Sequence, residues 1–100
     1  MKADLWYVFG SSRGGPNRLR LVYALEHRPR NANQLAKALD LDYTTVRHHL
    51  DVLMQHGVVS KTDDEYGAVY EPSESAREHW GTIEEIEIQQ REAETAENTV

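Results

Sequence analysis

Five polar side chains lie within six consecutive positions of the chain: Tyr43, Thr44, Thr45, Arg47 and His48. An arginine fork matches the O6 and N7 acceptors of guanine, and a threonine methyl can contact the methyl group of thymine. Hydroxyl groups of threonine and tyrosine bond to phosphates, and histidine donates to a phosphate or to a base edge. Together these residue types predict an interface with double-stranded DNA.

The same residues have a simpler explanation, because a polar helix face is most often only a solvated face. Tyr43 could cover Leu41 instead of contacting DNA. His49 falls on the apolar side of the same segment, where a packing role is more usual than ligand binding. The elements that position the polar face therefore decide between the two interpretations.

The flanking sequence predicts two helices joined by a short turn. Asn31 can cap the first helix, with Gln34 three positions later as the reciprocal partner. Asp42 can cap a second helix over 43–56, which Gly57 ends. This is the helix-turn-helix plan, in which the second helix presents its N-terminal half to the major groove. The apolar positions that would bury the first helix and the turn are Leu35, Ala36, Leu39 and Leu41.

The remaining periodicity predicts a mainly helical fold with one small β-hairpin, a winged helix-turn-helix with a three-helix core, a wing and an extra C-terminal helix. A first helix should run from Pro16 to His27, and the hairpin should place strands at 58–62 and 68–71 around a turn at 63–67. The predicted divisions are an N-terminal aromatic segment (1–13), the winged helix-turn-helix domain (14–72), a C-terminal helix (73–91) that Ser73 or Ser75 caps, and an acidic tail without fixed structure (92–100).

The net charge of −6 is unevenly distributed along the chain. Residues 1–62 carry nine Lys/Arg and five Asp/Glu, a net charge of +4, whereas residues 63–100 carry two Lys/Arg and twelve Asp/Glu, a net charge of −10. A basic front and an acidic rear are compatible with DNA binding, because the local field at the docking face steers association.

Several classes of function are disfavoured by what the sequence lacks. It has no cysteine, no Gly-rich phosphate loop and no nucleophile motif, so we expect no enzymatic activity and no cofactor. Five histidines (27, 48, 49, 56 and 79) match no metal-binding spacing, so we expect no metal site. The longest apolar run, Leu5 to Phe9, is too short for a membrane span or a signal segment, which favours a cytoplasmic protein.

Residues 33–59, NQLAKALDLDYTTVRHHLDVLMQHGVV, resemble the ArsR-like winged helix-turn-helix transcription regulators. The likeness covers about residues 14–72, and Gly14-Gly15 before the first helix resembles archaeal members of the family. The resemblance implies a cytoplasmic homodimer that binds pseudo-palindromic promoter DNA. The metal-sensing branch of the family carries a cysteine motif, which this chain lacks.

The wing also departs from the family pattern. Family wings often present Arg or Lys to the DNA, whereas the predicted tip here is Asp63-Asp64-Glu65. Either this tip points away from DNA, or salt screens its charge. Lys61 and Tyr66 are the only wing residues that we nominate for DNA contact.

The terminal segments predict a dimer contact through Trp6, Phe9, Trp80 and Ile83, which would place two recognition helices about 34 Å apart. The alternative is that these side chains cover the core of a single chain. A second function also stays open: a winged helix that docks proteins without binding DNA, which the acidic wing would suit. Salt-dependent DNA binding separates the two functions.

Overall fold

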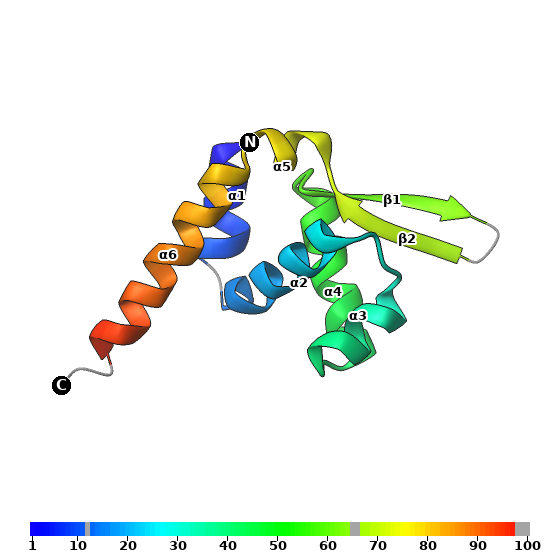
Figure 1. Cartoon of the computed structure of the whole chain (residues 1–100), viewed down its shortest axis with the longest axis horizontal. Coiled ribbons are helices and arrows are strands. Elements are labelled where there is room, and N and C mark those ends of the chain that lie inside the picture. The colour runs from blue at the N-terminus through cyan, green and yellow to red at the C-terminus, as the bar shows by residue number, and fades with distance from the viewer. Residues whose placement is uncertain (12, 65–66, 98–100) are drawn as a thin grey trace.

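The computed structural model describes residues 1–11, 13–64 and 67–97 and consists of helices with one two-stranded antiparallel sheet (Figure 1). The mainly helical fold class with a small hairpin is therefore confirmed. None of the helices in these ranges is long and apolar enough to cross a membrane. The elements are α1 (Lys2–Leu5), the π-helix η1 (Trp6–Gly10), α2 (Gly15–His27), α3 (Ala32–Leu39), α4 (Tyr43–Gln55), β1 (Val59–Asp64), β2 (Gly67–Pro72), α5 (Glu74–Glu78) and α6 (Trp80–Glu97).

Both predicted caps of the helix-turn-helix are formed. The Gln34 amide donates to Asn31 Oδ1 (2.8 Å), and the Asn31 amide donates to Gln34 Oε1 (2.9 Å) at the start of α3. The Thr44 amide donates to Asp42 Oδ2 (3.2 Å) at the start of α4. Between the helices, Asp40 adopts a left-handed conformation (φ 54°), which a short polar residue tolerates. The turn thus follows from local chemistry alone.

Helix α2 forms the centre of the hydrophobic core. Its apolar residues Leu21, Val22 and Leu25 are fully buried, and the helix packs on α3 and α4. Arg20 of α2 also donates from Nη2 to the Leu39 carbonyl (2.8 Å), which satisfies an acceptor at the end of α3. The fully buried residues of this group are Leu21, Val22, Leu25, Leu35, Val46, Leu50 and Leu53.

The wing differs from the prediction in the length of its strands. Asp63 pairs with Ala68 and Asp64 pairs with Gly67, so the first part of the predicted turn belongs to the ladder. The positive φ of Gly67 (113°) is a conformation that glycine adopts at little cost where the second strand begins. The nominated Tyr66 lies outside the described residues.

The single C-terminal helix predicted over 73–91 is two helices. Ser73 caps α5 by accepting from the Ala76 amide (3.0 Å), and α5 ends at His79 before α6 begins. The tail predicted to lack fixed structure is helical to Glu97. Residues with high helix propensity, mainly Glu and Ala, continue the helix here without an apolar face.

The two terminal segments pack on each other at the end of the molecule opposite the hairpin (Figure 1). Phe9 and Ile83 are fully buried in the core of the single chain, so the dimer contact predicted for these two residues is wrong. Trp6 and Trp80 remain partly exposed.

A buried polar pair lies beneath α4. Arg18 is 5% exposed; it donates from Nε to the Val8 carbonyl (2.8 Å) and from Nη1 to His49 Nδ1 (3.2 Å). Gly14 leaves the space for this pair, since a Cβ there would lie 2.6 Å from Arg18 Nη1 and 2.8 Å from His49 Cε1. As the sequence suggested, His49 has a packing role.

This pair makes stability depend on pH. The pKa of His49 lies below its ordinary value of 6.5, first because of burial and then because of the positive charge of Arg18 and the neighbouring His48. The unfolded chain therefore binds a proton on His49 more readily than the folded chain, and stability falls as the pH drops below 6.5. The free energy of unfolding, measured in urea, should fall more between about pH 7.5 and about pH 5.5 in the wild type than in His49→Gln. The amide oxygen of the introduced glutamine can still accept a hydrogen bond from Arg18. An equal loss in both proteins would contradict this, and His27→Gln at an exposed position is the control.

Candidate nucleic-acid interface

Helix α4 turns one face to the core and leaves the other to solvent. Val46, His49, Leu50 and Leu53 are buried on the inner face. Of the nominated residues, Tyr43, Thr44, Arg47 and His48 are exposed and Thr45 is half-buried at the edge; Asp51 and Gln55 are exposed further along the helix. The structure thus brings the nominated residues of this helix together on one accessible surface.

Lys61, the nominated wing residue, is exposed on β1 and pairs with Tyr70 of β2. Directly opposed residues of an antiparallel pair place their side chains on the same face of the sheet. Lys61 therefore shares a face with Tyr70. Asp63, opposite Ala68, lies on that face too, two pairs closer to the tip. The wing thus offers one cation and at least one carboxylate on the side that bears Tyr70.

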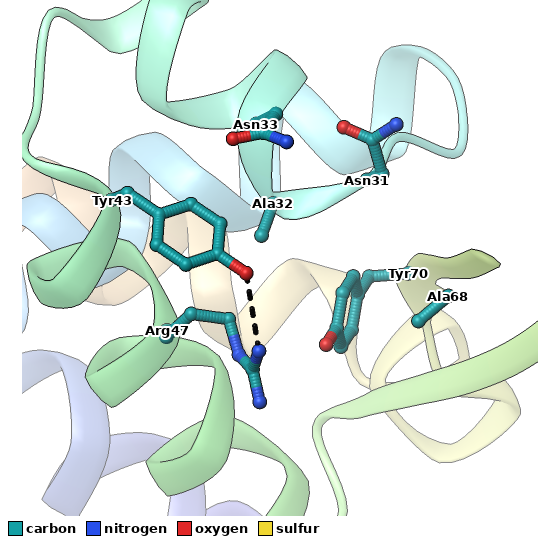
Figure 2. Close-up of a pocket in the computed structure, with 7 residues that line it drawn as sticks. All are labelled: Asn31, Ala32, Asn33, Tyr43, Arg47, Ala68 and Tyr70. Carbon is teal, nitrogen blue, oxygen red and sulfur yellow. Dashed lines mark hydrogen bonds between the residues drawn. The ribbon is translucent and has the colours of Figure 1, made fainter.

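A pocket of about 280 Å³ separates α4 from the wing (Figure 2). Backbone hydrogen bonds between Arg30 and Tyr70 (3.2 and 2.8 Å) hold β2 beside the segment that leads into α3. The pocket is therefore formed by three parts of the chain that are far apart in sequence. Its lining residues are Asn31, Ala32, Asn33, Tyr43, Arg47, Ala68 and Tyr70.

The guanidinium of Arg47 is turned into this pocket. It donates from Nη1 to the Tyr43 hydroxyl (3.2 Å), one helical turn earlier (Figure 2). The pKa of Arg47 lies above its ordinary value, first because of this hydrogen bond and then because of the nearby Tyr70. Arg47 is therefore a fully charged donor at the boundary between the helix and the wing.

Two pocket residues, Asn33 and Tyr70, were not nominated from the sequence. Asn33 lies in the first turn of α3, where a polar residue is usual, and Tyr70 lies in a strand, where an aromatic residue is usual. Neither position carries a local signal for a site. Only the return of β2 to the start of α3 brings them beside Arg47.

Within the described ranges no group of three or more His, Asp or Glu residues could hold a metal ion. Three histidines form hydrogen bonds in the described residues: His49 with Arg18, His56 with Asp4 (2.9 Å) and His79 with the Ser75 carbonyl (2.9 Å). The pairing with His56 also lowers the pKa of Asp4. The His49 and His56 rings join separate helices, whereas His79 at the end of α5 bonds to a carbonyl of that helix, so the three imidazoles do not converge on one point.

Comparison with protein families agrees with this geometry. Residues 15–61 match the family described as bacterial regulatory protein, arsR family, a range that spans α2, α3, α4 and the start of β1. No curated protein matches the chain in sequence.

Several solved structures have a similar fold at low sequence identity. The homodimeric DNA-binding domain Mb0332 from Mycobacterium bovis, a possible ArsR-family regulator, is 17% identical, with a TM-score of 0.66 over 92% of this chain and 77% of that chain. HlyU from Vibrio cholerae is 20% identical, with a TM-score of 0.64 over 90% and 89%. Rv0081 from M. tuberculosis is 20% identical, with a TM-score of 0.70 over 94% and 92%. The predicted winged helix-turn-helix fold is confirmed.

Proposed function

Because residues 15–61 carry the helix-turn-helix of the arsR family of regulators, we propose that this chain is a DNA-binding transcription regulator that inserts α4 into the major groove. The observation that supports this most is the polar face of α4. Its inner face is buried against α2 and α3, whereas its exposed N-terminal half carries donors suited to base edges and phosphates. The regulator acts by binding rather than by catalysis, in the cytoplasm.

In this proposal the DNA contacts come from both parts of the motif. Thr44 and His48 lie one turn apart on the exposed face of α4 and reach base edges or nearby phosphates. Tyr43 and Thr45 bond to the backbone, and Lys61 approaches it from the wing. Arg47 lies between the two groups.

The regulator binds as a homodimer, as the Mb0332 domain is described to be. Since Phe9 and Ile83 are buried, the contact uses the outer side of the same elements. Ile88 of α6 is 50% exposed, and Trp6 and Trp80 keep part of their surface accessible. A large apolar side chain at this exposure gains stability if a second copy covers it.

The dimer contact is tested by substituting Ile88. Ile88→Glu should shift the chain toward monomer by about tenfold in dissociation constant, because burying a carboxylate there opposes association. Sedimentation equilibrium measures the shift, and Ile88→Leu, which keeps the apolar surface, is the matched control. A dissociation constant that Ile88→Glu leaves unchanged would place the interface elsewhere.

The proposed function is tested by DNA binding at several salt concentrations. Labelled duplex from the region upstream of this gene should bind saturably in fluorescence anisotropy, more tightly than a scrambled duplex. A plot of log affinity against log salt should fall with a slope of about −0.9 per phosphate contact. No binding to either duplex at any salt concentration would favour the protein-docking function, with the acidic wing as the surface to investigate.

A further inference from the structure

The pocket between α4 and the wing presents donors and no carboxylate. Among the seven residues that line it, the polar side chains are two asparagines, two tyrosines and one arginine. The Asn31 side chain is already used in the α3 cap. The side-chain amide of Asn33 makes no hydrogen bond to any residue in the described part of the chain. A small anion is the ligand that such a lining suits.

Tyr70 is the most informative of these residues. Its side chain is 3% exposed, and its hydroxyl makes no hydrogen bond within residues 1–11, 13–64 and 67–97. Figure 2 shows this hydroxyl turned toward the guanidinium of Arg47, inside the pocket. The hydroxyl opens into the pocket, so it can donate to a ligand there while the ring stays buried.

Arg47 supplies the charge. A guanidinium has five N–H donors, and the structure uses one of them, toward Tyr43. This bond turns the side chain back along α4 and toward the wing. The Tyr43 hydroxyl accepts that bond and keeps its own proton to donate. The remaining donors of Arg47, the two tyrosine hydroxyls and Asn33 therefore surround one small volume.

We propose that this pocket binds one phosphate group of the DNA backbone, held by Arg47, Tyr70 and Asn33 where the wing meets the recognition helix. Arg47 is then a phosphate ligand, in place of the guanine reader that its residue type suggested. Lys61, opposite Tyr70, adds a second cation, and the carboxylate of Asp63, two residues closer to the tip on the same face, opposes the phosphate. The inference rests on the proposed DNA binding and assigns a site within it.

The test compares fold-losses on two duplexes, the upstream one and the scrambled one. Arg47→Ala should weaken binding to both by a similar factor, about tenfold, and reduce the salt slope by about one. Tyr70→Phe should weaken both by about fivefold without changing the salt slope, since it removes a hydrogen bond and no charge. Asp63→Asn should tighten both. Tyr7→Phe, an exposed tyrosine outside the pocket, is the matched control and should change nothing.

The outcomes are distinguishable. A loss with Arg47→Ala on the upstream duplex alone would make Arg47 a base reader and overturn the phosphate site while DNA binding stands. Wild-type affinity in both Arg47→Ala and Tyr70→Phe would overturn it as well. A wild type that binds neither duplex overturns the proposed function and this inference together.

In a separate experiment, the protein is titrated with inorganic phosphate and its backbone amide signals are followed by NMR. The proposal would be overturned if the Asn33 and Tyr70 amide shifts saturated at phosphate concentrations below the millimolar range while Arg47→Ala and Tyr70→Phe bound DNA like the wild type. The pocket would then bind free phosphate and not a phosphate of the DNA backbone.

Discussion

Phe9→Ala is expected to lower the free energy of unfolding by about 3–5 kcal/mol. The Phe9 ring is fully buried in the hydrophobic core, and removing it leaves a cavity that rigid helices close only in part. The loss should be the same at low and high protein concentration, because the ring packs within one chain. Chemical denaturation of the wild type and the variant at two concentrations measures this.

Ile88→Ala is the matched control for Phe9→Ala. Ile88 is 50% exposed on α6, so its truncation should change the unfolding free energy of the single chain by less than about 1 kcal/mol. A Phe9→Ala variant whose stability differed from the wild type only at high protein concentration would restore the dimer contact first predicted for Phe9. The pair of variants thus separates the core from the dimer surface.

Gly15→Ala should destabilise the fold by about 3 kcal/mol, although alanine in a helix is ordinarily favoured over glycine by about 1 kcal/mol. A Cβ at position 15 would lie 2.2 Å from the carbonyl oxygen of Phe9, a backbone atom that no side-chain rotation can move away. Gln90 also donates to this carbonyl, which further fixes its position. For a domain of this size, thermal denaturation should show a midpoint lower by more than about 10 °C.

The control for this substitution is Gly81→Ala. Gly81 lies in α6, and a Cβ there meets no atom within 4 Å, so the substitution should leave the midpoint unchanged or raise it. A Gly15→Ala variant that melts with the wild type would mean that η1 does not approach the start of α2 as closely as this structure has it. The same glycine-to-alanine substitution is thus expected to lower the melting midpoint at position 15 and not at position 81.

The helix-turn-helix was predictable because its determinants are local. The Asn31 and Asp42 caps act over two or three residues, and the apolar spacing of α2, α3 and α4 reports which face each helix buries. The exposed face of α4 followed from the same periodicity. For the site, the sequence therefore identified the helix and its polar residues correctly in position, while their contacts with DNA stay predictions.

The sequence was less informative where competing local preferences are nearly equal. Asp63 and Asp64 have turn propensity, yet pairing with Ala68 and Gly67 extends the ladder. The tail after Arg91 has no apolar face, so amphipathicity gave no reason to continue α6. Helix propensity alone continues it to Glu97.

By itself the sequence determined the order of the three core helices, the caps of α3 and α4, the polar face of α4 and the division of charge, because each depends on residues a few positions apart. Tertiary structure alone decided that Phe9 is core rather than interface and that Gly15 admits a crossing backbone. It also placed Tyr70 beside Arg47. The approach of Phe9 to α6 and of Tyr70 to Arg47 joins segments far apart in the chain, and the close approach of Phe9 to Gly15 depends on how η1 packs on α2. Each is set by the packing of the whole core and leaves no pattern in the neighbouring residues.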